Sequence, residues 1–304
     1  MPKHAYLIME HSNLPVAQAA IRMIDDPRND IFIYIDGDEV HQSDFVAKQS
    51  HIHFINHHID VFWADFMQVE MALIELAVNT GHYGYYHLLT DAGLPIKSQD
   101  QIHEFFDNDP NQMIYMHVNC HTFKSIQKQC AVNYPFFKSK AFRHSKVKKV
   151  LAKAASRIEY AFGINHLAKN KEIPVVYNGW QAFSIPDDFA RYIVEKKDLL
   201  HKTFDHALAN EEEAFQSLAM NSKFRYRMYG YNGKDDAQDA SKRMINWNPQ
   251  HWTPLVFTEK DFEAIKANKN CFFARKFYAN VDLEIVNKLE KDLVPINKGN
   301  SGGK

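Results

Sequence analysis

The chain has 304 residues, 45% of them hydrophobic and 24% charged, and its formal net charge at pH 7 is −1. This composition is typical of a folded globular protein, and the length suffices for one large domain or two smaller ones. The near-zero charge excludes a molecule-wide electrostatic attraction to nucleic acids or membranes. Three cysteines are too few for a disulfide framework, and no long apolar run opens the chain. We therefore expect a cytoplasmic protein without a membrane anchor.

Short apolar runs and helical spacings alternate along the first third of the chain. Strands and helices are predicted in turn at residues 5–9, 15–24, 31–35, 61–79, 85–89 and 98–106. This alternation with short links favours an α/β fold with a mainly parallel sheet. Ligands of such sheets bind beyond the carboxyl ends of the strands. Asp36 and Asp91 each follow such an end.

The remaining elements are predicted from weaker patterns. We expect strands at 113–118, 174–177 and 224–229, helices at 189–194 and from Thr258, and an apolar segment at 271–277. The stretch from Lys138 to Arg157 holds eight lysines or arginines and no acid. It is either a solvated basic helix or a patch for an anionic membrane or a phosphorylated substrate.

Three consecutive carboxylates, Glu211, Glu212 and Glu213, precede an apolar pattern with helical spacing. One interpretation is a charged cap on a solvated helix, because acidic residues stabilise a helix N-terminus. The other is that one carboxylate faces a cleft and acts as a general base. Neighbouring residues on a helix diverge by about 100°, so at most one of the three can face a given cleft squarely.

Another group of residues has the chemistry of a metal site. Asp36-Gly37-Asp38 follows a predicted strand, and two carboxylates at this spacing can hold Mg²⁺ or Mn²⁺. Together with the 17 histidines, including His51-Ile52-His53 and His57-His58, it raises the alternative of a metal-dependent hydrolase. No supporting carboxylate motif accompanies these histidines, so surface-loop histidines are the favoured interpretation.

Arg275 and Lys276 lie in an apolar frame between Phe273 and Phe277. They are either surface cations whose stems pack on apolar neighbours or a pair that neutralises a diphosphate. A cationic pair at a leaving diphosphate can take the place of a divalent metal.

Taken together, these stretches resemble the core-2/I-branching β-1,6-N-acetylglucosaminyltransferase family, which also contains the peptide O-xylosyltransferases. The Phe273-Ala274-Arg275-Lys276-Phe277 segment carries the most specific match, and the absence of an anchor or disulfides suggests a bacterial-type member. The similarity runs from about residue 5 to 289. Its matching segments are Ala5–Ile8, Tyr34–Asp36, Leu88–Ser98, Gly179–Ile185, Glu211–Ser222, Arg243–Trp247 and Phe273–Phe277.

The resemblance implies a GT-A-like nucleotide-sugar fold with a Rossmann-like N-terminal half and a mixed central sheet. It implies one domain over residues 1–297, with a nucleotide-binding half at about 1–130 and an acceptor and catalytic half at about 170–297. Residues 298–304 are expected to form a disordered tail.

The same resemblance assigns roles within an inverting, metal-independent transfer that needs no cofactor beyond the UDP-sugar donor. Glu212 corresponds to the catalytic base. The donor site corresponds to Asp36, Trp63, Arg243, Arg275 and Lys276, and the acceptor site to Trp180 and Trp247.

The implied enzyme transfers N-acetylglucosamine in β-1,6 linkage from a UDP-sugar to a glycan, glycolipid or glycoprotein acceptor. A UDP-xylose-dependent transferase and the hydrolase with Asp36 and Asp38 remain alternatives. The basic stretch suggests a peripheral contact with an anionic membrane, at its inner face. A nucleic-acid partner is not expected.

Overall fold

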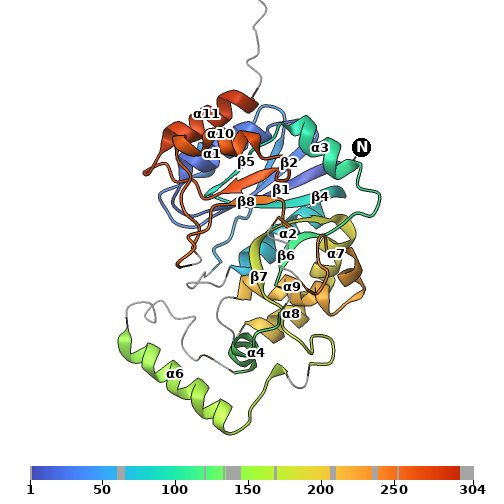
Figure 1. Ribbon diagram of the computed structural model, residues 1–304, viewed down its shortest axis with the longest axis vertical. Coiled ribbons are helices and arrows are strands. Elements are labelled where there is room, and N and C mark those ends of the chain that lie inside the picture. Colours follow the sequence, from blue (N-terminus) through green and yellow to red (C-terminus); the bar gives the residue numbers. More distant parts are fainter. Residues whose placement is uncertain are drawn as a thin grey trace, which may run out of the picture.

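The computed structural model describes residues 2–59, 66–119, 121–132, 134, 145–167, 170–205, 210–234, 239–251 and 253–294. A six-stranded sheet in the order β3-β2-β1-β4-β7-β6 forms its centre (Figure 1). The strands are β1 (Lys3–Glu10), β2 (Asn29–Ile35), β3 (His51–Phe54), β4 (Tyr83–Thr90), β6 (Tyr115–Val118) and β7 (Gly179–Pro186). β1 to β4 run parallel, β7 runs antiparallel to β4, and β6 runs antiparallel to β7. The α/β class with a mixed central sheet is thereby confirmed.

Side chains of the parallel strands alternate between two apolar layers, as the period of two along a strand requires. Leu7, Phe32 and Leu88 join the layer that contains α2 (Met67–Thr80). Tyr6 and Ile33 join the opposite layer, with α1 (Leu14–Ile24) and α3 (Gln99–Asp107). The helix predicted at 98–106 is confirmed as α3, and Ser98 caps it, because its hydroxyl accepts a hydrogen bond from the Gln101 N–H.

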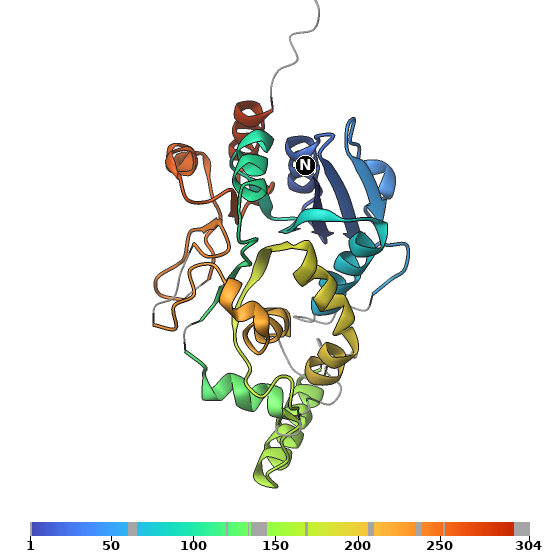
Figure 2. The same cartoon turned by 90° about the vertical axis from the view of Figure 1, so that its right-hand side faces the viewer.

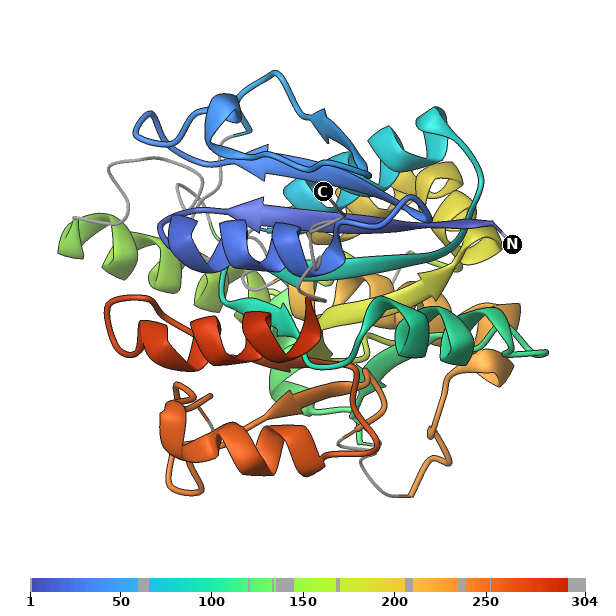
Figure 3. The same cartoon turned by 90° about the horizontal axis from the view of Figure 1, so that it is seen from above.

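A second, three-stranded sheet lies beside the first and carries the C-terminal cations. It has the order β5-β9-β8, with β5 (Gly93–Pro95), β8 (Arg243–Ile245) and β9 (Phe273–Arg275). It packs with α1, α10 (Phe262–Ala267) and α11 (Leu283–Leu293) around a third apolar cluster. Figure 3 shows α11 in red and α1 in blue side by side. The chain thus brings its last strand back beside β5, which directly follows the strand end at Thr90.

The other helices cover β7 and the lower part of the molecule in Figure 2. They are α4 (Lys124–Ala131), α6 (Lys146–Ala161), α7 (Asp187–Glu195), α8 (Lys197–Phe204) and α9 (Ala214–Met220). Short 3-10 helices are η1 (Gln42–Asp44), η3 (Asn210–Glu212), η4 (Lys223–Arg227) and η5 (Glu259–Asp261). In the described part of the chain, no helix has both the length and the apolar content that a membrane span requires.

Two predicted strands are wrong, and side-chain hydrogen bonds explain both errors. Residues 174–177 form no strand, because the Val176 N–H bonds the Gln127 side chain and the Tyr177 N–H bonds the Ser217 hydroxyl. Residues 224–229 begin with the 3-10 helix η4, which Ser222 caps by accepting from the Phe224 N–H at 3.2 Å. Such local bonds compete with a strand ladder, and the apolar pattern does not register them.

His51 and His53 also differ from the surface-loop interpretation, because both lie in the edge strand β3. The His53 ring stacks on Phe32 with centroids 4.8 Å apart.

Candidate active site

The carboxyl ends of β1, β2 and β4 bring His11, Asp36 and Asp91 together. His11 Nδ1 lies 2.8 Å from Asp36 Oδ2, and the backbone N–H groups of His11 and Ser12 donate to Asp91 Oδ2. The backbone N–H groups of Asp36 and Asp91 in turn donate to carbonyls of β1. The expectation that both aspartates lie at strand ends of one sheet edge is confirmed. We refer to His11, Asp36 and Asp91 as the strand-end group.

Asn13, which the sequence patterns did not single out, ties this group to the C-terminal cations. Its buried side chain donates to the carbonyls of Asp91 and Phe277 at 2.8 and 2.9 Å, and accepts from the Ala279 N–H. Asn13 is the N-cap residue of α1, yet its side chain makes no capping hydrogen bond. Its own N–H donates to Glu10, whose pKa is raised to about 7 by burial and by Asp91.

Arg275 ends β9 and Lys276 follows it, both partly exposed. The Lys276 ammonium lies 4.8 Å from the centroid of the Tyr278 ring. Neither cation has an ion-pair partner among the described residues. Burial lowers the pKa of Arg275, whereas nearby Tyr278, Glu212 and Asp91 raise it. Arg275 is therefore close enough to both Asp91 of the strand-end group and Glu212 to interact with them electrostatically.

The three consecutive glutamates differ strongly in exposure. Glu211 and Glu213 are 8% and 3% exposed, whereas Glu212 between them is partly exposed. They occupy η3 and the N-cap of α9, and all of α9 is buried. The interpretation as a charged cap on a solvated helix is therefore wrong. The side-chain amide of Asn178 donates to Glu213 Oε1 at 3.3 Å.

Burial raises the pKa of three carboxyl groups in this region, those of Glu70, Glu212 and Glu213. It raises the pKa of Glu212, while Asn178 and then Arg275 lower it. It raises the pKa of Glu213 to about 9, with the charges of Glu212 and Glu211 adding to the effect. Glu70 of α2 lies fully inside the protein beside Glu211, and its pKa is well above the ordinary value for the same reasons. We call Glu70 and Glu211–Glu213 the acidic cluster. Because ionising several buried, mutually repelling carboxyls is unfavourable, the surroundings favour the protonated form of Glu70 and of Glu213.

Trp180 and Trp247 lie together beside this cluster. Their ring centroids are 4.8 Å apart, and Trp180 also stacks on His117 at 4.0 Å. The Trp180 carbonyl accepts from the side chain of Gln216 in α9. The two tryptophans, 67 residues apart in sequence, thus form one aromatic surface near η3.

Arg243 is 3% exposed and lies between the two sheets. Its guanidinium donates to the Ser184 hydroxyl at 2.8 Å and to the carbonyls of Leu88, Phe183 and Ser241. Burial lowers the pKa of Arg243 to about 9. Together with Gln181 and Arg275 it lines a small cavity next to Thr90. The predicted role of Arg243 toward the donor stays a prediction.

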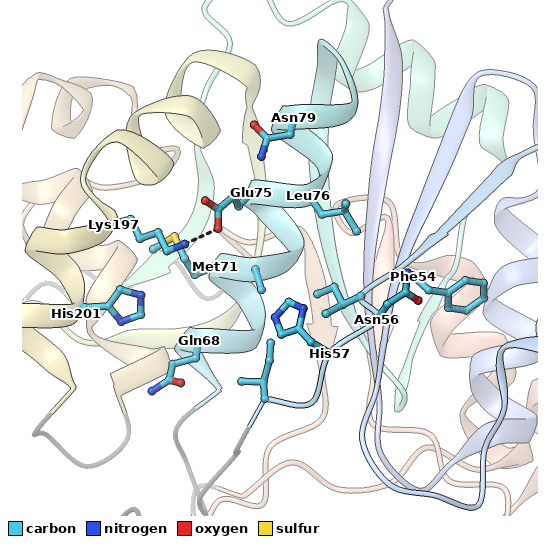
Figure 4. A pocket seen from close by; sticks show the side chains of 13 residues that line it. Phe54, Asn56, His57, Gln68, Met71, Glu75, Leu76, Asn79, Lys197 and His201 are labelled. Atoms are coloured by element: carbon cyan, nitrogen blue, oxygen red, sulfur yellow. Dashed lines mark hydrogen bonds and ion pairs between the residues drawn. The ribbon is translucent and has the colours of Figure 1, made fainter.

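Trp63, predicted to lie near the uracil, falls outside the described residues. A pocket of about 590 Å³ lies between the end of β3, α2 and α8 (Figure 4). An ion pair of 2.5 Å between Lys197 and Glu75 crosses one side of it. His57 lines this pocket, and none of the predicted catalytic or donor residues that the structure describes does.

One group of described residues has a composition suited to a metal ion, namely His4, His103 and Asp107. The two imidazole rings stack with centroids 4.0 Å apart, and each contacts one Asp107 oxygen at 3.2 Å. Stacked rings direct their nitrogen lone pairs in parallel rather than at one point, so hydrogen bonding explains the group better than coordination. It contains neither Asp36 nor Asp38, the aspartates of the hydrolase alternative.

Comparison with known proteins identifies the fold family. Residues 4–268 match the family model described as "Branch: Core-2/I-Branching enzyme". The chain is also similar to "Xylosyltransferase sqv-6" of Caenorhabditis briggsae, with 33% identity over 126 residues. That alignment covers 36% of this chain and 15% of the relative, so the chain spans a small part of that protein's length. Because the family match covers most of the sequence, the chain belongs to the core-2/I-branching enzyme family of glycosyltransferases.

Proposed function

We propose that the protein is an inverting glycosyltransferase that moves a sugar from a UDP-sugar to a hydroxyl group of a glycan, with Glu212 as the catalytic base. The observation that carries the proposal is the partly exposed Glu212 carboxylate, which interacts electrostatically with Arg275, in a chain of this family. An inverting transfer needs a base on one side of the anomeric carbon and charge compensation behind the leaving group.

In the proposed reaction, the acceptor oxygen forms a bond to the anomeric carbon while its proton passes to a carboxylate oxygen of Glu212. The bond from that carbon to the diphosphate oxygen breaks, and UDP leaves with the electron pair. Arg275 and Lys276 stabilise the negative charge that develops on the diphosphate. The raised pKa of Glu212 suits a base that works near neutral pH.

Donor binding is proposed for the strand-end group and the cation pair. Asp36 accepts hydrogen bonds from the uridine, and Arg275 with Lys276 contacts the diphosphate, so that catalysis needs no divalent metal. Trp63 and Arg243 complete the proposed donor site. The Asn13 bonds to the Asp91 and Phe277 carbonyls support this arrangement, because they hold the two parts together.

The proposed acceptor is a glycan, glycolipid or glycoprotein that contacts Trp180 and Trp247. Aromatic faces stack on sugar rings, and this pair of tryptophans lies next to the acidic cluster. For the donor we propose UDP-N-acetylglucosamine with a β-1,6 linkage. The second candidate is UDP-xylose, which the name of the xylosyltransferase relative favours.

Thermal-shift measurement against a panel of UDP-sugars tests the donor assignment. A ligand that binds only the folded state raises the apparent stability by mass action. We expect UDP-N-acetylglucosamine to raise the melting temperature more than UDP-xylose, UDP-glucose or free uridine does. A larger shift with UDP-xylose selects the second candidate, and no shift with any UDP-sugar contradicts the donor proposal.

We also propose that the enzyme works at the inner face of a membrane, where an anionic surface attracts the basic stretch 138–157. Only the part from residue 145 onward lies in the described chain, and it forms most of α6. α6 contains five lysines or arginines and one acidic residue, Glu159. This excess supports electrostatic attraction to anionic lipids.

A further inference from the structure

The helix α6 exposes its apolar side chains and buries its small ones. Of the 13 large hydrophobic residues that are exposed in the described part of the chain, seven lie between residues 147 and 164. They are Val147, Val150, Leu151, Ile158, Tyr160, Phe162 and Ile164, with exposures from 43% to 81%. A surface helix of a globular protein normally turns its apolar side toward the core. α6 has the opposite orientation.

Four of the exposed apolar residues of α6 form one continuous stripe. At about 100° per residue, Val147, Val150, Leu151 and Ile158 fall within about one third of the helix circumference. Ala154, also exposed, lies between them. The stripe is therefore a defined face, continued past the helix by Phe162.

The opposite face holds α6 on the protein. Ala152 and Ser156 are the buried residues of the helix. The Lys128 ammonium of α4 lies 3.6 Å from the centroid of the Tyr160 ring, and the His166 N–H donates to the Ala131 carbonyl. These contacts fix which side of α6 faces outward. Figures 1 and 2 both show α6 at the end of the molecule remote from α11.

Cations border the stripe along one edge. Lys146, Lys153 and Arg157 are exposed, and the same rotation of about 100° per residue places them together next to Val150. An apolar face with a lysine and arginine border is the pattern of helices that lie in the plane of an anionic membrane surface. Two copies of this face would bring like charges together, so a second copy is a poorer partner.

We propose that α6 inserts its apolar stripe into the interface of an anionic bilayer, with Lys146, Lys153 and Arg157 at the lipid headgroups. This inference deepens the membrane contact proposed above and adds apolar insertion to electrostatic attraction. It is independent of which sugar the enzyme transfers. It orients the molecule, because α6 defines the side that faces the lipid.

Vesicle co-sedimentation tests the inference. The probes are vesicles of phosphatidylglycerol mixed with phosphatidylcholine, and vesicles of phosphatidylcholine alone. The apolar variant combines Val150→Ser, Leu151→Ser and Ile158→Ser. The matched control combines Val46→Ser, Val281→Ser and Leu283→Ser, which removes three exposed apolar side chains elsewhere. A charge variant combines Lys146→Gln, Lys153→Gln and Arg157→Gln.

We expect the unmodified protein to bind the anionic vesicles and the control to bind equally well. The apolar variant should bind roughly tenfold more weakly or worse. The charge variant should lose about fivefold per residue at low salt. Residual binding of the unmodified protein at high salt should disappear in the apolar variant.

Wild-type-like binding by the apolar variant overturns insertion and leaves an electrostatic contact. No binding of anionic vesicles by the unmodified protein overturns both. A dimer that dissociates only in the apolar variant, detected by light scattering, shows that a second copy covers the stripe and overturns the lipid partner. Thermal shifts with UDP-sugars in the same samples separate this result from the donor proposal.

Discussion

The strand-end group and the acidic cluster both gather carboxylates, yet their surroundings are opposite. Asp36 is hydrogen-bonded to the His11 ring, and Asp91 accepts hydrogen bonds from the backbone N–H groups of His11 and Ser12. Glu70, Glu211 and Glu213 are instead buried inside the protein. Burial and mutual repulsion raise the pKa of Glu70 and Glu213, whereas Asp36 and Asp91 are held by hydrogen bonds.

This difference suggests a division of labour. Carboxylates that backbone and histidine N–H groups already hold are suited to fixed hydrogen bonds with a ligand such as uridine. A carboxylate of raised pKa at the edge of a buried cluster is suited to accept a proton. In our proposal, Glu212 is the only member of the cluster that is also partly exposed near Arg275. The predictions below test this division.

The largest expected effect follows Glu212→Gln, which keeps the shape of the side chain and removes its basicity. Turnover should fall by about 10²–10⁴-fold. In the unmodified enzyme, kcat/KM should decline as the pH falls through the raised pKa of Glu212, because the base must be ionised. Steady-state kinetics with a UDP-sugar and acceptor measures both.

Glu211→Gln and Glu213→Gln are the matched controls and should retain most activity. An inactive Glu213→Gln enzyme would move the base by one residue. If all three variants stay active, the acidic cluster has a structural role only.

Gly179→Ala should destabilise the part of the fold that holds the acidic cluster. An added Cβ would lie 1.9 Å from the His117 carbonyl oxygen and 3.0 Å from Gln216 in α9. Backbone must therefore move between β6 and β7, and we expect a loss of about 3 kcal/mol of unfolding free energy. Urea unfolding measures it. Gly81→Ala is the control, because its nearest neighbour would be a side-chain atom at 3.8 Å. Equal stability of the two variants would contradict this packing.

Lys276→Ala should weaken UDP binding without a comparable loss of stability. A charge-assisted bond to phosphate contributes roughly 1.5–3 kcal/mol, so the dissociation constant should rise about 10- to 100-fold. Lys269→Ala, at an exposed position nearby in sequence, is the control. Unchanged UDP affinity in the Lys276 variant would remove this residue from the donor site.

A further prediction concerns the pH dependence of stability. The pKa of Glu213 is about 9 in the folded protein and 4.5 in its ordinary state, so folding retains a proton that the unfolded chain releases. Stability should therefore fall as the pH rises from 4.5 towards 9, by at most about 1.4 kcal/mol per unit. Glu213→Gln should flatten this decline in urea unfolding at a series of pH values. A decline of unchanged slope would show that other groups cause it.

Much of the fold follows from local patterns, because the parallel strands are uninterrupted apolar runs. Asp36 and Asp91 were predictable at the sheet edge since parallel strands end on the same side. For the three glutamates, the sequence predicted only that at most one of them can face a cleft. Which of the three is exposed depends on η3, a 3-10 turn before α9 that the apolar spacing does not reveal.

Other features depend on contacts between residues distant in sequence. Asn13 joins Asp91 and Phe277, which lie 78 and 264 residues away, and no local pattern contains that information. The outward orientation of the apolar stripe on α6 likewise required the packing of Ala152 and Ser156. The basic composition of this stretch was visible in the sequence, whereas the direction of its apolar face was not.

The proposed metal independence offers a separate check on the cation pair. UDP-sugar turnover should survive exhaustive treatment with EDTA, because Arg275 and Lys276 stabilise the leaving diphosphate. Turnover that disappears with EDTA and returns with Mn²⁺ would instead assign a metal-binding role to Asp36 and Asp38.

Calorimetric titration with UDP tests the division between the two carboxylate groups most directly. It should be performed on the unmodified protein, Asp36→Asn and Glu212→Gln, with turnover measured on the same samples. Our account predicts that Asp36→Asn weakens UDP binding, whereas Glu212→Gln binds UDP like the unmodified protein and has lost turnover. Equal loss of UDP affinity in both variants, or full turnover by Glu212→Gln, would contradict it.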